Sequence, residues 1–137
     1  MKEIIHINKE NYKDYMNLDI IAFSFAFGGA QGSPGEIIVV TKDAQLYDMN
    51  YCYDNITIEM CYEVCPPLKG CSFGMFEVEK TPIGWEGISL GAGNFLVLAE
   101  PLYDQLIQEM SEIPPYILYG RWINMVINKI NTQETSN

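Results

Sequence analysis

Basic residues, histidine and long apolar runs are all scarce in this chain, and each scarcity excludes a class of protein. The 137 residues contain 8 Lys and Arg against 18 Asp and Glu, which gives a formal net charge of −10. A body this acidic repels phosphate backbones, so we expect no binding to nucleic acid. The longest uninterrupted apolar run is far shorter than the roughly 18 residues of a membrane-spanning helix, so we expect no membrane insertion.

The motifs of common catalytic and cofactor sites are also missing. His6 is the one histidine, and no serine or cysteine motif accompanies it. The stretch from Gly91 to Leu96 begins like a dinucleotide-binding fingerprint, but it ends in Leu instead of Gly and continues as a strand-like run. Gly28 to Gly35 lacks the Lys-Ser/Thr pair of a phosphate-binding loop, and no closely spaced run of acids would hold calcium or magnesium. We therefore expect no cofactor, no metal and no enzymatic activity.

Four cysteines have the spacing C-x8-C-x3-C-x5-C, which differs from the short paired knuckles of zinc sites. They are Cys52, Cys61, Cys65 and Cys71. The first residues carry neither an apolar segment of about 7 to 15 residues nor a small-residue cleavage site, so nothing indicates an oxidising compartment. We therefore predict reduced, mostly buried thiols in a cytoplasmic protein, with a metal site or a disulfide as the alternatives.

The region from Asp19 to Tyr53 predicts three consecutive antiparallel strands. Its first apolar run alternates large residues on one face with small residues on the other, as expected for a central strand covered on both sides. The large face is Ile21, Phe23, Phe25 and Phe27, and the small face is Ile20, Ala22, Ser24 and Ala26. Residues 28–35 turn the chain into a second strand over residues 36–41, and a further turn leads to a third over residues 46–53.

Residues 55–65 fit two patterns. Their apolar residues alternate as in a strand, but they also form a helical stripe. Asn55 or Thr57 would be the N-cap of such a helix, and Pro66-Pro67 would end it before a loop over residues 68–72. We favour the helix.

The remaining elements complete a single α+β domain over residues 1–130. The sequence predicts a mostly antiparallel sheet of about five or six strands, with the terminal helices packed on one of its faces. Further strands are expected at residues 3–7, 73–79, 85–90 and 95–99. A short helix is expected near the N-terminus, with Tyr12, Tyr15 and Met16 facing inward. Two more helices are expected to begin at Pro101 and at Tyr119, and Tyr119 is expected to face inward. Residues 131–137 are expected to be a disordered polar tail.

Aromatic residues interleave with acids in the middle of the chain, a composition typical of an interface to a basic protein. Residues 18–112 hold 14 Asp and Glu against 3 Lys, and their field would attract such a partner. The predicted partner-binding residues are Trp85, Glu86, Asp48, Tyr51, Tyr53, Asp54 and Glu63. The alternative is that the aromatics form the core and the acids a solvated rim. Paired acids such as Glu77 with Glu79 are expected to be solvated rather than catalytic.

In size, single-domain layout, acidity, absence of catalytic motifs and Asn- and Ile-rich composition, the chain resembles bacterial immunity proteins. These are the small cytoplasmic proteins that bacteria encode against basic secreted toxins of the contact-dependent-inhibition and polymorphic-toxin type. The resemblance is one of overall character and implies a non-catalytic protein that occludes the active site of a basic toxin domain. Two alternatives are a small enzyme or ligand-binding domain with a pocket between sheet and helices, and a homo-oligomeric structural protein.

Overall fold

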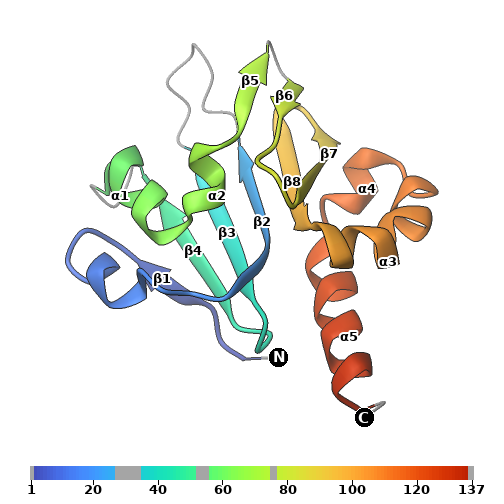
Figure 1. Cartoon of the computed structure of the whole chain (residues 1–137), viewed down its shortest axis with the longest axis horizontal. Helices are drawn as coiled ribbons and strands as arrows, with labels where there is room; N and C mark the ends of the chain where they lie inside the picture. Colours follow the sequence, from blue (N-terminus) through green and yellow to red (C-terminus); the bar gives the residue numbers. More distant parts are fainter. Residues whose placement is uncertain (1, 27–34, 52–55, 75–76, 136–137) are drawn as a thin grey trace.

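The computed structural model describes residues 2–26, 35–51, 56–74 and 77–135 and has a six-stranded sheet at its centre (Figure 1). The strand order is β1-β4-β3-β2-β8-β7. These strands are β1 (Ile5–Ile7), β2 (Ile20–Ala26), β3 (Glu36–Thr41), β4 (Leu46–Asn50), β7 (Trp85–Gly91) and β8 (Asn94–Ala99). β1 pairs with β4 in parallel, and the other described pairs of this sheet are antiparallel. The predicted α+β class and its mostly antiparallel sheet are confirmed.

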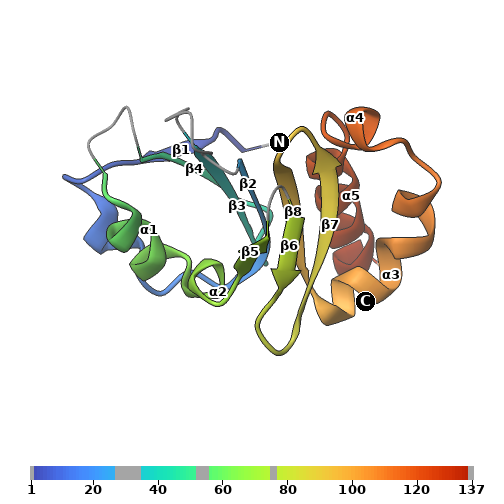
Figure 2. The same ribbon diagram turned by 90° about the horizontal axis from the view of Figure 1, so that it is seen from above.

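Helices cover both faces of the sheet, whereas the sequence predicted helices on one face (Figure 2). One face carries the 3-10 helix η1 (Tyr12–Tyr15), α1 (Ile58–Val64) and α2 (Pro66–Lys69). The other carries α3 (Glu100–Ser111), α4 (Pro115–Leu118) and α5 (Trp122–Thr135). The one-face prediction was wrong because the mid-chain helices supply a second apolar layer, in which Cys61, Val64 and Leu68 are buried.

Two apolar cores result, one on each side of the sheet, because successive strand residues point to opposite faces. The first core lies beneath α1 and α2 and includes Phe23 and Phe25, as predicted, whereas Phe27 lies outside the described residues. The second core lies beneath α3 and α5 and includes Leu98 and Trp122. The three strands at the centre of the sheet are therefore covered on both sides.

A register irregularity at the start of β2 changes the predicted faces. Ile20 pairs with Thr41 while Ala22 pairs with Val40, so Ile21 is an extra residue in β2. Such a β-bulge interrupts the alternation of side chains along the strand. Ile21 consequently packs against the second core and Ile20 against the first, the reverse of the prediction.

The ambiguous segment after β4 contains a helix, as favoured. Thr57 is the N-cap of α1, and its side-chain oxygen accepts a hydrogen bond of 3.2 Å from the backbone N–H of Met60. The two prolines that follow α1 begin α2, since proline is tolerated in the first helical turn. The predicted loop over residues 68–72 is therefore wrong at Leu68 and Lys69, which are helical.

The single strand predicted over residues 73–79 is in fact two strands. β5 (Ser72–Gly74) and β6 (Glu77–Lys80) pair antiparallel as a separate two-stranded sheet, and residues 75 and 76 lie outside the described part. Within β6, Val78 packs against the first core while Glu77 and Glu79 are exposed, as the alternation predicted.

The terminal helices follow the predicted pattern with three differences. Tyr119 is 55% exposed instead of buried, because it lies at the C-cap of α4, where the chain turns between two helices. α5 continues to Thr135 and so includes most of the segment predicted as a tail. At the other end of the chain η1 is a single short turn, and Met16 after it is exposed rather than packed inward.

Candidate functional site

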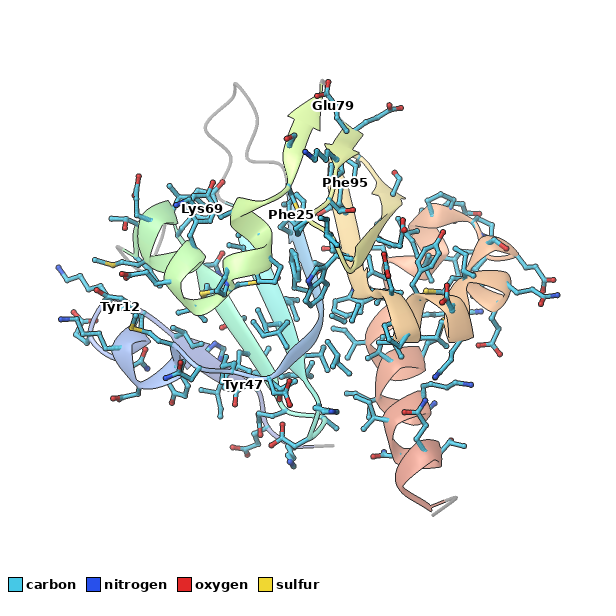
Figure 3. The ribbon with its side chains drawn as sticks, in the orientation of Figure 1. Tyr12, Phe25, Tyr47, Lys69, Glu79 and Phe95 are labelled. Carbon is cyan, nitrogen blue, oxygen red and sulfur yellow. The ribbon has the colours of Figure 1, made fainter. Side chains whose placement is uncertain are left out.

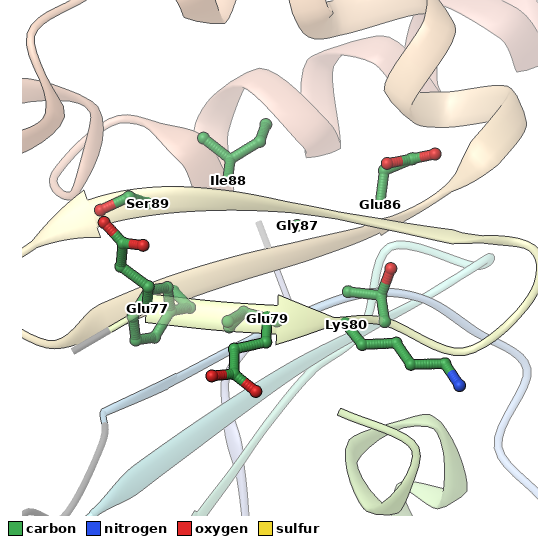
Figure 4. Close-up of a pocket in the computed structure, with 10 residues that line it drawn as sticks. Glu77, Glu79, Lys80, Glu86, Gly87, Ile88 and Ser89 are labelled. Atoms are coloured by element: carbon green, nitrogen blue, oxygen red, sulfur yellow. The ribbon is translucent and has the colours of Figure 1, made fainter. Parts of the chain in front are cut away.

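A groove of about 330 Å³ opens between β6 and β7, two consecutive strands that do not pair with each other (Figure 4). β7 is the edge strand of the large sheet, and the described partner of β6 is β5. Two hydrogen bonds close the turn that joins β6 to β7. The Trp85 N–H donates to the Pro82 carbonyl oxygen at 3.1 Å, and the Thr81 hydroxyl donates to the Trp85 carbonyl oxygen at 2.8 Å.

The conformation of this turn explains why the two strands separate. Gly84 has a φ of 91° and Ile83 has a negative φ, which together with the backbone hydrogen bond define a type II turn. The backbone twist of type II turns does not match that of paired strands, so the strands splay. The turn between β7 and β8 is of type I′, with φ of 51° at Ala92 and 78° at Gly93, and there the strands pair from Trp85 to Gly91 with one register irregularity between Ser89 and Gly91.

A glycine lets β6 lie close to β7 despite the splay. A Cβ atom built on Gly87 would lie 3.4 Å from Cγ2 of Thr81 and 3.8 Å from Cγ1 of Val78. A Cβ atom at position 87 would therefore be in ordinary van der Waals contact with residues of β6 and its turn.

Three carboxylates surround the groove. Glu77 and Glu79 extend from β6 and Glu86 from β7, and all three side chains are exposed; Glu86 lies on the face of β7 opposite to Trp85 and to the first core. Figure 4 shows the Glu77 carboxylate next to Ser89 of the opposite strand. The apolar part of the lining is Val78, Ile88 and Phe95, and the lining contains one cation, Lys80.

Aromatic packing makes the floor of the groove rigid. Phe95 is 2% exposed, and its ring centroid lies 5.7 Å from that of Phe25 in the adjacent strand β2 (Figure 3). Both rings belong to the first core, so the groove rests on well-packed strands rather than on a loop.

Two acids elsewhere in the described part of the chain lie next to a basic side chain. Lys2 lies 3.5 Å from Asp43, and the His6 Nδ1 lies 2.6 Å from a carboxylate oxygen of Asp48. A hydrogen bond from the Thr41 hydroxyl, with help from Lys2, lowers the pKa of Asp43 below its ordinary value. None of the three groove carboxylates forms an ion pair with any residue that the structure describes.

This arrangement can bind a cation more readily than it can catalyse acid–base chemistry. Carboxylates accept short, strong hydrogen bonds from ammonium and guanidinium groups. The apolar floor suits the methylene stem of a lysine or arginine side chain, which buries its carbons while its head stays polar. Acid–base catalysis by paired carboxylates uses an enclosed site, whereas this groove is open and its acids are solvated.

The leading predicted pair, Trp85 and Glu86, is divided between the two faces of β7. Trp85 is half-buried and packs against the first core, with its ring centroid 5.6 Å from that of Phe23. Glu86 is exposed and lines the groove. Adjacent residues of a strand point to opposite faces, so these two side chains do not form one patch.

The other predicted residues lie far from Glu86. Asp48 is on β4, four strand positions from β7, which corresponds to about 19 Å at about 4.8 Å per strand. Tyr51 is half-buried against the first core, and Glu63 is exposed on α1. Tyr53 and Asp54 lie outside the described residues. The described part of the chain therefore does not bring the predicted set together.

Sequence reasoning missed the groove itself. The Glu-Val-Glu alternation correctly placed Glu77 and Glu79 on one strand face, but neither was counted among the partner-binding residues. The available signal was the Ile83-Gly84 turn, because glycine in second position with a non-glycine before it favours a type II turn and hence splayed strands.

Three of the four cysteines are free, buried thiols, as predicted, and Cys52 lies outside the described residues. Burial raises the pKa of Cys61 to about 12 and that of Cys71 to about 11. Burial also raises the pKa of Cys65. The described residues contain no group of three or more His, Cys, Asp or Glu that could hold a metal ion.

Comparisons with known proteins found no match, so inferences about function rest on the fold and the groove. No family model matches the chain, and neither a curated protein nor a solved structure matches it. Among the described residues, no helix has the length and apolarity needed to cross a membrane.

Proposed function

We propose that this chain is a non-catalytic acidic binding protein that receives basic side chains of a protein partner in the groove between β6 and β7. The observation that carries the proposal is that three exposed acids, Glu77, Glu79 and Glu86, line one groove, each without an ion-pair partner among the described residues. In a chain with a net charge of −10, these are charges that a cationic partner would satisfy.

The charge distribution supports a role in partner capture more than in stability. Exposed carboxylates without cations contribute little to folding, and like charges close together cost some stability. The same charges accelerate encounter with a basic surface and disfavour acidic competitors. A groove with an apolar floor and an acidic border therefore suits a lysine or arginine of a partner.

The partner that we propose is a basic toxin domain, whose active site the chain would occlude. Support comes from the resemblance in overall character to bacterial immunity proteins, from the marked acidity and from the solvated acids of the groove. The chain would inhibit the toxin domain by tight association alone, without catalysing a reaction.

Co-expression with the neighbouring gene product tests this function. If the neighbour encodes a basic domain that kills cells unless this chain is present, and the two co-purify, the proposal stands. A non-toxic neighbour that does not co-purify overturns it. Association should also slow at least about tenfold between about 50 and 500 mM salt, because screening removes electrostatic steering.

Charge-matched variants locate the binding surface. The groove variant combines Glu77→Gln, Glu79→Gln and Glu86→Gln, and its control combines Glu10→Gln, Glu59→Gln and Glu112→Gln, which are exposed elsewhere. Both variants change the net charge equally. The groove variant should slow association about tenfold more than the control. Equal effects of the two variants would show that net charge, and not the groove, attracts the partner.

A further inference from the structure

Ile83 stands at the tip of the turn between β6 and β7 and is fully exposed, with 102% of its reference surface area. A single exposed apolar residue is ordinary on a protein surface. This one, however, occupies the first central position of a type II turn, where proline is common and a β-branched apolar side chain adds nothing to the turn. The conformation of the turn therefore gives no reason for an isoleucine side chain at this position.

The turn holds Ile83 rigidly. Pro82 has a φ fixed by its ring, and its carbonyl oxygen accepts the Trp85 N–H. Gly70, at the end of α2, packs directly on the proline ring, since a Cβ atom at Gly70 would lie 2.8 Å from Cβ of Pro82. A side chain presented on a backbone already held in place loses less entropy on binding.

The surroundings of Ile83 match the anatomy of an anchor in an interface. Lys80 and Glu86, at the two borders of the turn, are exposed and belong to the acidic groove. Binding energy in interfaces concentrates in a few side chains that fill a partner's pocket, with polar groups around them that exclude water. An apolar tip with an exposed Lys80 on one side and an exposed Glu86 on the other has this composition.

We infer that Ile83 is the apolar anchor of the docking surface, and that the partner is a protein with an apolar pocket bordered by Lys or Arg. This inference rests on the proposed function and adds the shape of the partner to it. In the complex, Ile83 enters the pocket while Glu77, Glu79 and Glu86 accept hydrogen bonds from the basic border. The adjacent carboxylates disfavour an anionic membrane as the surface that Ile83 enters.

Surface plasmon resonance with the basic domain of the neighbouring gene tests the anchor. Ile83→Ser should weaken binding at least about tenfold, mainly through faster dissociation, while Ile83→Leu should stay within about threefold of the wild type. The matched control is Tyr116→Ser on α4, because Tyr116 is also an exposed apolar side chain, at 78%. The melting temperature of Ile83→Ser should stay within about 2 °C of the wild type, because the side chain makes no buried contact.

The outcomes separate the anchor from the proposed function. If wild type binds and the groove variant is impaired, but Ile83→Ser binds within about twofold of wild type, the anchor is overturned and the function stands. An equal loss in Tyr116→Ser also overturns it. If wild type sediments with phosphatidylserine vesicles and Ile83→Ser does not, Ile83 contacts membrane instead. If wild type does not bind the basic domain, the function fails and the anchor with it.

Discussion

Replacing Trp85 by alanine should destabilise the fold, because its indole packs on the first core instead of standing free for a partner. The ring lies 5.6 Å from Phe23, centroid to centroid, and is half-buried. Truncating a fully buried aromatic side chain costs about 3–5 kcal/mol, and half burial reduces this to about 2 kcal/mol. Part of that figure is the aromatic pair itself, which contributes about 0.5–1.5 kcal/mol.

Urea unfolding followed by tryptophan fluorescence measures this cost. Trp122, buried in the second core on α5, remains as the fluorophore after Trp85 is removed. With an m-value of about 2 kcal/mol per M, a loss of about 2 kcal/mol lowers the urea midpoint by about 1 M. The m-value itself should not change, since the variant removes packing and leaves the overall fold.

The matched control is Glu86→Ala on the next residue of the same strand. Its side chain is exposed, so the free energy of unfolding should change by less than about 0.5 kcal/mol. If Trp85→Ala is also within about 0.5 kcal/mol of the wild type, the packing argument is refuted. Trp85 would then be available as an aromatic anchor, as the sequence interpretation had it.

Three further changes test other parts of the structure. Gly70→Ala should cost about 1–3 kcal/mol in unfolding free energy, because the new Cβ would lie 2.8 Å from Cβ of Pro82; an unchanged melting temperature would contradict this contact. Ala92→Asn should stabilise the hairpin by about 0.5–1 kcal/mol in urea unfolding, because Ala92 has a positive φ that asparagine tolerates. Buried Cys61 keeps its proton up to a pKa of about 12, against an ordinary value of 9.0, so wild-type stability should fall as pH rises above 9.0. Cys61→Ala should flatten that fall in melting temperature, and equal slopes would contradict the raised pKa.

Local patterns in the sequence were sufficient for most individual elements. The strand over residues 36–41 and the helix beginning near Pro101 match β3 and α3 closely, because period-two alternation and a helical apolar stripe are local properties. Thr57 was recognised as a possible cap because its side chain and the N–H it accepts lie three residues apart.

Features decided by neighbouring elements could not be predicted in this way. The alternation from Ile20 to Ala26 continues unbroken in the sequence, and only the pairing of β2 with β3 introduces the bulge at Ile21. The exposure of Tyr119 likewise follows from the turn between α4 and α5 and not from its helical position. Such outcomes depend on tertiary contacts between segments distant in sequence.

The sequence indicates the acidic character of the candidate site but does not indicate where the site lies in the fold. Acidity and solvated carboxylates were readable from the sequence, and Glu86 is among the predicted partner-binding residues. Their position around one groove was not, because Glu77 and Glu86 belong to two strands whose separation depends on the conformation of one turn. Trp85 illustrates the same limit, since an aromatic side chain in a strand can serve a core or an interface equally well.

The two turns that bound β7 show how the chain keeps one strand edge paired and the other available. Positive φ at both Ala92 and Gly93 gives a turn whose twist matches paired strands, and β7 pairs with β8 from Trp85 to Gly91. At the other end only Gly84 has a positive φ, the strands splay, and β6 pairs with β5 instead. An edge strand left open invites pairing with other chains, and acidic side chains beside the edge oppose it. We therefore expect the carboxylates of the groove to disfavour self-association through β7, while the same edge stays open to the basic partner that we propose.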